Sequence, residues 1–498
     1  MAKKWQIMPR ISTDFKKQFP LHNETVLQLL KNRGLIEPQE IEAFLDADYE
    51  KYSHDPFLFT DMEKAVALII SHIKAGNKMV VYGDYDADGV TSSAILWSVL
   101  TSLHAKAEVY IPNRVTEGYG LNIPAIDEII NSGVKLIITV DNGIRNKKEV
   151  EYIKKANVDV IITDHHVGPP NKSELPDTLI INPVLADEKY PFKYLAGVGV
   201  ASKLALAIIM RSTLEAQNKT KLENKILDLV AIGTIADCVT LLGENRVLVK
   251  RGLEILNKTN RVGLKELFSV AKINTDKKLD SWNIGFQISP RLNAAGRMDH
   301  ANTAYELLIT KDKEEAEVLA RDLNNRNIDR QKITEEIVFE IIKDINQESL
   351  ANGQKILIAV SPSIYDQTKE PWNEGIIGLV AGRLSEKYYL PALVITGNDK
   401  EIKGSGRSIE EFNVIKAVES LNKNLEKYGG HAAACGFSIA GQDNLNNFIK
   451  EITSLAGEQL SQMNLLPTLS IDAELDFALL DEQLVEQIEN LAPFGEDN

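Results

Sequence analysis

The chain has 498 residues, of which 71 are acidic and 56 basic, and its formal charge is −15. At about 100–200 residues per domain, this length predicts two to four domains with buried cores. A hydrophobic content of 44% with 26% charged residues excludes a largely disordered, collagen-like or coiled-coil chain. The acidic charge also argues against a protein that coats nucleic acid through bulk positive charge, but it is compatible with a local basic groove.

Cysteine content and hydropathy indicate the cellular compartment in which the protein is expected. The two cysteines, Cys238 and Cys435, provide neither a disulfide framework nor a thiolate metal site. We therefore predict that both are small buried residues in a reducing compartment. The N-terminal segment lacks the apolar core of a secretory signal, and no run approaches the ~20 apolar residues of a membrane helix. These features predict a soluble, cytoplasmic protein without a membrane partner.

The first half of the chain is predicted to be an α/β domain. Residues 1–55 are expected to form a mixed helical lead-in. Short apolar strands then alternate with helices, which indicates βαβ units, right-handed crossovers and a mostly parallel sheet. The strands are predicted at residues 78–82, 107–111, 135–140, 158–163 and 178–182, and two of the helices at 91–103 and 146–156. Residues 197–310 are predicted to be largely helical.

The second half is predicted to form another lobe. Residues 312–348 contain no glycine or proline and many good helix formers, which predicts one long helix, or two nearly continuous ones, joining two lobes. Strands are then expected at 355–360, 391–396 and 433–440, and helices at about 376–388, 412–427 and 443–460. The last residues contain an apolar run, a helix and APFGEDN. We expect from this ending that the chain is a fragment of a longer protein.

Acidic residues and histidines follow three of the predicted strands. Strand 78–82 is followed by GDYDADG, strand 135–140 by DNG, and strand 158–163 by DHH. The carboxyl ends of parallel strands meet at one edge of a sheet. The side chains expected to meet there are Asp84, Asp86, Asp88, Asp141, Asp164, His165 and His166. Asp237, in TIADCVTL, adds a carboxylate after an apolar helix or strand.

Such a cluster requires neutralising charge, because clustered carboxylates raise one another's pKa and destabilise the fold. Divalent cations supply that charge. Carboxylate and imidazole without thiolate suit Mn²⁺ or Mg²⁺, with Zn²⁺ or Co²⁺ as alternatives. About five ligands with a central aspartate able to bridge match a site for two ions ~3.5–4 Å apart. Sites of this kind activate water and hold phosphoryl oxygens during in-line displacement.

Each motif taken alone has a simpler interpretation. DYDADG is compatible with a calcium loop or a turn, although it does not continue into an EF-hand. DNG is most often a turn, and DHH alone fits a surface turn with a capping aspartate. The coincidence of all three at successive strand ends favours the metal site. The remaining histidines of interest are interpreted as surface or packing residues: His22, His54, His72, His104 and His300.

A second set of motifs carries basic and small residues. GSGRS places Ser405 and Arg407 among glycines in a short strand or turn, where both side chains can donate to a phosphate. In GGHAAACGFS, Gly429 is interpreted as the left-handed cap of a preceding helix, which leaves His431 free to face a ligand. Further candidates are Arg291, Asn293 and Arg297 in SPRLNAAGR, and Arg114 and Tyr119 in IPNRVTEGYGL. An isolated arginine is usually a surface charge, but four in small-residue loops suggest a track for an anionic polymer, with Tyr119 as a base-stacking ring.

These motifs resemble those of the DHH phosphoesterase superfamily and, within it, the RecJ single-strand-specific DNA exonucleases. GDYDADGVTS, VDNG, TDHH and ADCVTL are similar to the four metal-binding motifs of the superfamily, in order. SPRLNAAGRM, GSGRS, GGHAAACGFS and LAPFG are more particular to RecJ. The resemblance covers nearly the whole chain. It implies two α/β lobes, a DHH domain with a mostly parallel sheet and a smaller associated domain, joined by a long helix with the active site in the cleft.

The resemblance also implies domain limits. These are residues 1–55 for the lead-in, 56–310 for the DHH domain, 311–350 for the connecting helix, 351–460 for the associated domain, and 461–498 for a truncated segment preceding an OB-fold. RecJ proteins resume with an OB-fold domain where this sequence stops, so we expect weaker DNA binding and lower processivity. Asn373, in WNEGIIG, replaces a histidine found in many relatives and is assigned no chemistry.

The implied activity is removal of nucleotides from single-stranded DNA in the 5′-to-3′ direction, with two Mn²⁺ or Mg²⁺ ions, in DNA repair and recombination. The implied metal ligands are Asp86, Asp88, Asp141 as the bridging residue, His165 and Asp237, with Asp84 as a further ligand or supporting carboxylate. His166 and His431 would contact the scissile phosphate, and Asp164 would orient a histidine. The implied DNA-binding residues are Arg114, Tyr119, Arg291, Asn293, Arg297, Ser405 and Arg407. The implied partners are a single-stranded DNA-binding protein and a RecQ-type helicase.

Two other functions remain open at this point. One is a short-oligonucleotide or cyclic-dinucleotide phosphodiesterase of the same superfamily, although such enzymes are typically shorter and lack the combination of SPRLNAAGR and GSGRS. The other is a non-catalytic DNA-binding replication scaffold, in which the metal motifs would be degraded. Comparing the hydrolysis of long single-stranded DNA with that of a dinucleotide separates the first, and Mn²⁺-dependent activity excludes the second.

Overall fold

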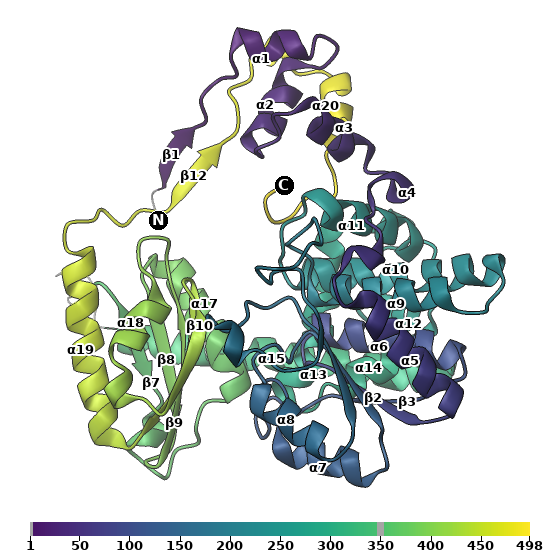
Figure 1. The fold of residues 1–498 in the computed structure, drawn as a ribbon. Helices are drawn as coiled ribbons and strands as arrows, with labels where there is room; N and C mark the ends of the chain where they lie inside the picture. Colours follow the sequence, from purple (N-terminus) through teal and green to yellow (C-terminus); the bar gives the residue numbers. More distant parts are fainter. Residues whose placement is uncertain (1–2, 346–352) are drawn as a thin grey trace. The chain divides into compact units, whose positions relative to one another are not determined.

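The structure is a computed structural model that describes residues 3–345 and 353–498. The chain divides into two compact units, which are described separately (Figure 1). The larger unit comprises Pro9–Asn327 and Asp472–Asn498, and the smaller unit comprises Met1–Met8 and Ile328–Ile471. Among the described residues, no helix has both the length and the apolar character needed to cross a membrane.

A five-stranded parallel sheet lies at the centre of the larger unit, in the order β3-β2-β4-β5-β6. Its strands are β2 (Lys78–Tyr82), β3 (Lys106–Tyr110), β4 (Leu136–Val140), β5 (Asp159–Thr163) and β6 (Leu179–Ile181). The predicted mostly parallel sheet is thus confirmed, with each strand within one residue of its predicted ends. The buried, apolar β2, β4 and β5 show the sequence pattern of strands covered on both faces.

Alternate residues of these strands enter two separate apolar clusters. Val81 and Ile138 pack in the cluster that includes residues of α5 (Met62–Ala75), α6 (Ala87–Ser102) and α9 (Gly197–Arg211). Val80 and Ile137 pack on the opposite face, with residues of α7 (Ile123–Asn131) and α8 (Lys147–Lys155). This follows from the two-residue period of a strand, which sends successive side chains to opposite faces. The helices therefore bury both faces of the sheet and leave its edge for the loops that follow the strands.

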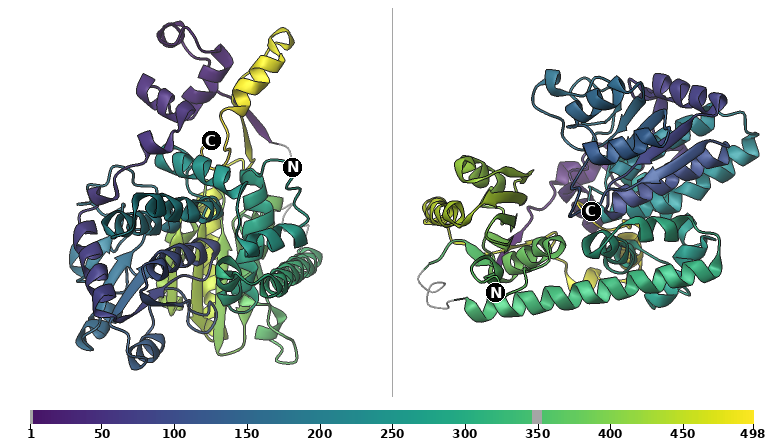
Figure 2. Two further views of the ribbon diagram at one scale, coloured as in Figure 1. Left: turned by 90° about the vertical axis from the view of Figure 1, so that its right-hand side faces the viewer. Right: turned by 90° about the horizontal axis from the view of Figure 1, so that it is seen from below.

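The rest of the larger unit is mainly helical, as predicted for residues 197–310. The elements are α10 (Ala216–Ala236), α11 (Gly243–Leu256), α12 (Val262–Val270), the π-helix η3 (Asn283–Ile288), α13 (Ser289–Met298) and α14 (Asn302–Ile309). They are followed by α15 (Lys313–Asp344), one continuous helix of 32 residues, and the boundary between the two units falls within it (Figure 2). The predicted helix extended to residue 348, and its last three residues lie outside the described ranges.

The segments near the two termini pack together within the larger unit. The helices α1 (Thr13–Gln18), α2 (Glu24–Asn32) and α3 (Pro38–Asp46) share an apolar cluster with α20 (Glu482–Glu489), and α4 (Tyr49–Tyr52) follows. The guanidinium of the buried Arg246, on α11, donates to the carbonyls of Phe44, Leu491 and Ala492 at 2.7–2.9 Å. The side chain of Arg246 therefore links the LAPFG segment to α11 and α3 of the larger unit by hydrogen bonds.

The smaller unit holds a second five-stranded sheet, in the order β10-β11-β9-β8-β7, with β7 and β8 parallel and the other pairs antiparallel. Its strands are β7 (Leu357–Val360), β8 (Ala392–Gly397), β9 (Glu401–Arg407), β10 (Lys427–His431) and β11 (Ala434–Ala440). The helices are α17 (Glu374–Tyr388), α18 (Val414–Ser420) and α19 (Gln442–Leu460). A strand absent from the prediction, β1 (Lys4–Ile7), pairs in parallel with β12 (Thr468–Ile471).

The structure corrects one part of the predicted second lobe. The helix expected at residues 412–427 ends at Ser420, and residues 427–431 form the edge strand β10. Gly429 is therefore not the cap of a helix, because it lies in β10 opposite Gly436 of β11. The left-handed backbone occurs instead at Gly430, with φ +142°. The ladder with β11 satisfies the backbone groups of this segment, a long-range pairing that local helix propensity does not reveal.

Candidate metal centre

The GDYDADG motif forms the turn from β2 into α6. Oδ1 of Asp86 caps α6 by accepting the amides of Asp88 (3.0 Å) and Gly89 (3.1 Å). A Cβ at Gly89 would lie 2.6 Å from the carbonyl oxygen of Asp84, so the turn requires glycine at this position. The strand end and the helix cap together bring three carboxylates to one turn of the chain.

The carboxylate of Asp88 is anchored by the N-terminus of another helix. Its Oδ2 and Oδ1 accept the amides of Gly197 (2.7 Å) and Val198 (2.8 Å), the first two residues of α9. These amides have no partner inside their own helix, and the helix dipole favours a negative charge there. Asp88 is therefore held as a buried carboxylate by residues more than one hundred positions away in the chain.

Asp141 occupies the first position after β4 in an unusual backbone conformation. Its φ is +63°, in the left-handed region that residues other than glycine rarely adopt. The turn is held by the neighbouring Asn142, whose Nδ2 donates to the carbonyls of Tyr82 (3.2 Å) and Val140 (2.9 Å). Gly197 lies directly behind the carboxylate, since a Cβ there would lie 2.5 Å from Oδ1 of Asp141. Close packing thus fixes both the backbone and the side chain of Asp141.

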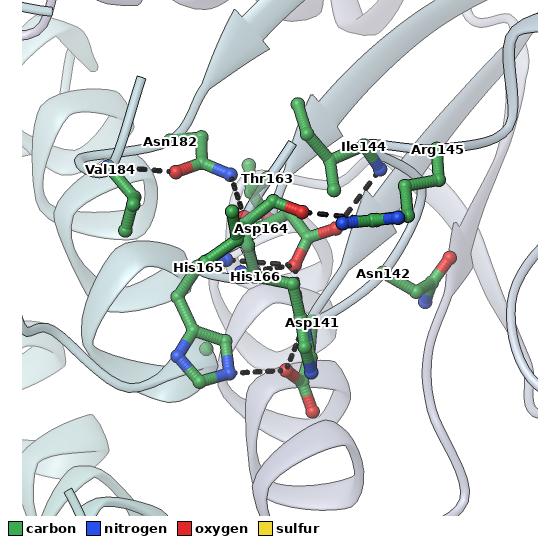
Figure 3. Close-up of polar contacts among 12 residues, drawn as sticks. Asp141, Asn142, Ile144, Arg145, Thr163, Asp164, His165, His166, Asn182 and Val184 are labelled. Atoms are coloured by element: carbon green, nitrogen blue, oxygen red, sulfur yellow. Dashed lines mark hydrogen bonds and ion pairs between the residues drawn. The ribbon is translucent and has the colours of Figure 1, made fainter. Parts of the chain in front are cut away.

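The DHH motif folds around the carboxylate of Asp164, which is fully buried (Figure 3). Its Oδ1 accepts the amides of His165 (2.8 Å) and His166 (3.0 Å), and its Oδ2 accepts the amide of Ile144 (3.0 Å). Nδ1 of His166 also lies 2.8 Å from Oδ1. Burial by itself would raise the pKa of Asp164, but the hydrogen bonds and charge of His166 hold it below its ordinary value.

The other histidine of the motif turns towards the carboxylates. Nε2 of His165 lies 3.2 Å from Oδ1 of Asp141 and 3.6 Å from Oδ2 of Asp237, which caps the end of α10. Three groups of side chains each bring ligand atoms within 4.8 Å of one another: Asp84, Asp86 and Asp141; Asp88, His165 and Asp237; and Asp141, His165 and His166. Asp141 and His165 each belong to two groups, so the three form one continuous cluster.

The charge state of this cluster shows strong mutual repulsion. Burial, followed by repulsion from the neighbouring carboxylates, raises the pKa of Asp84 and Asp141 well above the ordinary value. The same causes raise the pKa of Asp88 to about 7 and that of Asp237 to about 9. Burial, followed by the charge of His166, lowers the pKa of His165 to about 4. His165 is therefore a neutral imidazole near pH 7, as a metal ligand must be.

The residues present fit a divalent cation. Oδ1 of Asp84, Oδ1 of Asp141 and Nε2 of His165 are buried atoms without a hydrogen-bond partner in the described chain. The ring of His165 hydrogen-bonds the backbone of Leu195, and this bond involves Nδ1 because Nε2 has no partner. Nε2 then presents its lone pair to the oxygens of Asp141 and Asp237. A divalent cation would take the place of the protons that these carboxyl groups retain without metal, and a set of oxygen and imidazole ligands without sulfur is the set that suits Mn²⁺ and Mg²⁺.

Cys238 follows Asp237 directly but is exposed, so the prediction that both cysteines are buried is wrong for this one. Its backbone has φ +57°, and the turn after α10 brings it to the surface. Cys435 is buried as predicted, and burial raises the pKa of its thiol to about 11. Neither sulfur belongs to the three groups of candidate ligands.

Two of the predicted substrate-binding residues lie beside the metal motifs. The guanidinium of Arg114 stacks over the ring of Tyr85, 4.7 Å from its centroid, within the GDYDADG loop. The hydroxyl of Tyr119 lies 3.1 Å from the carbonyl of Asp141 and 3.0 Å from Nδ1 of His166. The hydroxyl of Tyr119 thus contacts both the DNG and the DHH motif, and the residue as a whole is 48% exposed.

The SPRLNAAGR residues lie on α13, which packs against the same loop. Oδ1 of Asn293 accepts the amide of Ala87 at 2.8 Å, so this side chain supports the first turn of α6. Arg291 donates to Oδ1 of Asn324 at 3.1 Å and to the carbonyl of Gln287 at 2.6 Å. Arg297 follows two turns later on the helix, and its charge acts on the phenol of Tyr85.

The remaining predicted residues lie in the smaller unit. Ser405 and Arg407 occupy alternate positions of β9 and therefore share one face of the sheet. Gly378 of α17 packs against them, because a Cβ there would lie 3.1 Å from Oγ of Ser405 and 3.3 Å from Nη2 of Arg407. His431 is the last residue of β10 and is exposed. Asn373, to which no chemistry was assigned, caps α17 by accepting the amide of Gly375.

Several residues that support the centre were not predicted. Gly197 and Val198 hold Asp88, Asn142 holds the turn at Asp141, and the backbone of Leu195 fixes the tautomer of His165. The run AGVGVAS around Gly197 is a sequence signal that a helix begins in close contact with another segment. The partner of that contact could not be derived from the run itself.

Comparison with known proteins gives a consistent result. Residues 78–234 match the DHH family, N-terminal domain, and residues 353–458 match the DHHA1 domain. The single-stranded-DNA-specific exonuclease RecJ of Bacillus subtilis is 38% identical over 477 residues, covering 94% of this chain and 57% of the relative. RecJ of Haemophilus influenzae is 34% identical over 496 residues, covering 97% of this chain and 84% of the relative. This chain therefore spans little more than half the length of the Bacillus protein.

The fold is similar to solved structures of RecJ from Thermus thermophilus. The structure in complex with Mn²⁺ superposes with a TM-score of 0.82 at 27% identity and covers 99% of this chain and 68% of that one. The structure in complex with Mg²⁺ gives a TM-score of 0.76 at 26% identity, with 99% and 67% covered. The predicted arrangement of two α/β domains is thus confirmed, and the structural relatives bind the two metals that the donor set favours.

Proposed function

This chain belongs to the family of RecJ single-stranded-DNA-specific exonucleases, and from that premise we propose that it hydrolyses single-stranded DNA from the 5′ end to 5′ mononucleotides. The observation that supports this most directly is the cluster of buried carboxylates around the neutral imidazole of His165. Its unpartnered atoms come from three strand ends, and Asp237 adds a further candidate ligand from the end of α10. Every metal motif is present, which disfavours a non-catalytic scaffold.

We propose that the centre holds two Mn²⁺ or Mg²⁺ ions. One group of ligands would be Asp84, Asp86 and Asp141, and the other Asp88, His165 and Asp237. Asp141 would be shared, because it belongs to the first group and its Oδ1 also lies 3.2 Å from Nε2 of His165 in the second. The chemistry that two such ions supply is activation of water and stabilisation of the attacking and leaving oxygens.

His166 is the proposed donor to the scissile phosphate. Its Nδ1 is occupied by Asp164, so Nε2 is the nitrogen available to a substrate oxygen, and its side chain is 45% exposed. Burial by itself would lower the pKa of this imidazole, but the hydrogen bond and charge of Asp164 raise it above the ordinary value. A raised pKa favours the protonated ring, which stabilises negative charge on the phosphoryl oxygens.

The proposed DNA track begins in the larger unit. Arg114 and Arg291 would hold phosphates, and Asn293 and Arg297 would support them from α13 beside the metal loop. The hydroxyl of Tyr119 orients His166, while its exposed ring offers a face to a base. In the smaller unit, Ser405, Arg407 and His431 form a second proposed phosphate-binding group, and their action on the same substrate is part of the proposal.

The resemblance to RecJ supports the remaining elements of the proposal. Residues 56–310 would be the phosphoesterase domain and residues 351–460 the associated domain, with 1–55 as lead-in, 311–350 as connector and 461–498 as a separate C-terminal segment. A single-stranded DNA-binding protein and a RecQ-type helicase would be the partners, in the cytoplasm.

One assay tests substrate, polarity and metal dependence together. Single-stranded DNA labelled at the 5′ or the 3′ end is incubated with the protein, with and without Mn²⁺, beside a 5′-phosphorylated dinucleotide. We expect the 5′ label to be released first as a mononucleotide, only with Mn²⁺, and long DNA to be preferred. Release of the 3′ label first, or preference for the dinucleotide, would overturn the proposal.

Asp141→Asn is the matched inactive variant. Asparagine tolerates the left-handed backbone and keeps the shape of the side chain, so only the charge is lost. We expect cleavage to fall about 100- to 1,000-fold, the usual effect of removing a group that stabilises transition-state charge. The control, Asp127→Asn, changes a half-buried aspartate on α7 that accepts the hydroxyl of Tyr152, and it should retain full activity.

A further inference from the structure

Two exposed aromatic rings stack on each other at the surface of the larger unit. Trp282 and Phe286 are 55% and 70% exposed, with ring centroids 5.7 Å apart and planes inclined by 29°. Phe494, 40% exposed, belongs to the adjoining segment, because its carbonyl accepts the hydroxyl of Ser281. Large exposed aromatic surfaces of this kind usually mark an interaction site rather than ordinary surface.

Phe286 lies in the π-helix η3 and Trp282 directly precedes it, and the sequence explains why this wide turn forms. Pro290 has no amide hydrogen and its ring would clash with the carbonyl four residues earlier, so a regular α-helix cannot pass through this point unchanged. The helix widens instead, and the amide of Ser289 donates to the carbonyl of Ile284, five residues earlier. Wide turns of this type occur frequently at functional sites, because they re-aim side chains.

The same helical segment connects these rings to the metal centre. Gly285, between them, packs towards Ile235, two residues before Asp237: a Cβ there would lie 4.0 Å from Cγ2 of Ile235. At the other end of the segment, Asn293 holds the first turn of α6. Gly296 fits closely against the GDYDADG loop, since a Cβ there would lie 2.5 Å from the carbonyl of Tyr85.

The charges nearby are of both signs, and the adjoining segment of Phe494 carries the exposed Glu496 and Asp497. The exposed loop before Trp282 carries Lys272, Lys277 and Lys278 against Asp276 and Asp280. Oδ1 of Asp280 is occupied by the amide of Asn283 at 3.0 Å. Arg291 lies one turn beyond Phe286 on the same segment. Single-stranded nucleic acid is therefore favoured by the stacked rings and by the helical segment they share with Arg291 and Asn293, because aromatic rings stack on bases of any sequence.

We propose that Trp282 and Phe286 form a platform on which bases of single-stranded DNA stack outside the metal centre. This inference rests on the proposed function and adds a second contact region on the same unit. The platform would hold nucleotides beyond the one being cleaved. It would therefore act on long substrates and not on a dinucleotide, which ends at the metal centre.

The test is the double variant Trp282→Ala/Phe286→Ala, assayed with Mn²⁺. Both side chains are mostly exposed, so the variant should fold. We expect the KM for long single-stranded DNA to rise about 10- to 100-fold, the usual effect of removing a base-stacking ring, with kcat and dinucleotide hydrolysis unchanged. Phe477→Ala removes a ring that is 91% exposed and lies elsewhere, so it is the control and should leave KM unaltered.

Binding measured without cleavage separates this inference from the proposed function. In the Asp141→Asn background with Mn²⁺, fluorescence anisotropy of a labelled oligothymidylate should show the same loss of affinity, and Trp282→Phe/Phe286→Tyr should restore it. An unchanged Kd for the oligothymidylate in the alanine variant would overturn the proposed stacking of bases on Trp282 and Phe286, and the exposed rings would then be assigned to binding of a protein. An equal loss of dinucleotide hydrolysis would also overturn it. Absence of cleavage by the wild-type protein would contradict the proposed function, while the binding comparison would still decide on the platform.

Discussion

Oδ1 of Asp164 and Nδ1 of His166 lie 2.8 Å apart, and this contact joins a fully buried carboxylate to a partly exposed imidazole. Both partners shift in the direction that favours the charged pair, since the pKa of Asp164 is lowered and that of His166 is raised. The two backbone amides that also bind Oδ1 keep the carboxylate in place when the imidazole moves. The DHH turn therefore holds the ring of His166 in one orientation, in which Nε2 is the available donor nitrogen.

Replacing the charge in this pair should alter the pH profile of cleavage. Asp164→Asn keeps an acceptor for the amides but removes the anion, so the pKa of His166 should fall. A protonated donor is lost as pH rises through its pKa, so the alkaline limb of kcat should move to lower pH and kcat should fall about 10- to 100-fold. Asp177→Asn, at an exposed partner of Lys154, is the control. An alkaline limb at the wild-type position would contradict this role of Asp164.

Metal affinity should rise with pH. The raised pKa values of Asp88, about 7, and Asp237, about 9, mean that the metal-free folded protein binds more protons than the unfolded chain above pH ~4. Its free energy of unfolding should therefore fall as pH rises from about 4 to 9. Divalent ions displace these protons, so the increase in melting temperature caused by Mn²⁺ should grow from pH 5 to pH 8. Calorimetry in two buffers should detect proton release at pH 6, and its absence would contradict the prediction.

Gly197→Ala should weaken metal binding without unfolding the protein. An added Cβ would lie 2.5–2.6 Å from Oδ1, Cγ and Cβ of Asp141, so the whole side chain would have to move. Alanine is itself favoured in helices, so the stability of α9 should be preserved. We expect the affinity for Mn²⁺, measured by titration calorimetry, to fall about tenfold, or ~1.4 kcal/mol. Gly457→Ala, in an open position on α19, should leave it unchanged. Normal affinity in Gly197→Ala would show that Asp141 is not confined as described.

The buried pair of Lys203 and Glu244 should be important for stability and not for catalysis. Nζ of Lys203 lies 2.6 Å from Oε1 of Glu244 and also donates to Oγ of Ser53 (2.9 Å) and the carbonyl of His54 (2.8 Å). Lys203→Met would leave the buried carboxylate of Glu244 without its cation, with only the amide of His54 and the hydroxyl of Tyr190 donating to it, and breaking such a buried pair costs about 3–5 kcal/mol. Urea denaturation should show this loss, whereas Lys64→Met, at an exposed lysine, should change little. If Lys203→Met costs less than ~1 kcal/mol, the pair does not stabilise the fold as inferred.

Much of the fold follows from local sequence patterns. Apolar runs such as KMVVY and KLIITV are too short for helices, and their alternation with amphipathic helices predicts a parallel sheet. The sheet edge then follows from geometry, because parallel strands end on the same side and deliver GDYDADG, DNG and DHH together. The secondary-structure prediction was wrong where long-range strand pairing determines the local structure, as in residues 427–431. There two glycines suggested the end of a helix, and the ladder with β11 forms a strand.

The side chains that carry the chemistry and the strand ends at which they stand could be identified from the residues alone, because residue identity and strand alternation are local properties. The charge state and hydrogen bonding of these side chains depend on the folded chain. The carboxylate of Asp88 accepts an amide at the start of α9, and the backbone of Leu195 sets the tautomer of His165. The side chain of Asn293 accepts the amide of Ala87 in the GDYDADG loop. The stacking and exposure of Trp282 and Phe286 also appear only in the folded chain. Burial and hydrogen-bond partners set the charge state of each of these groups, and both depend on segments that are remote in the chain and meet only when it folds.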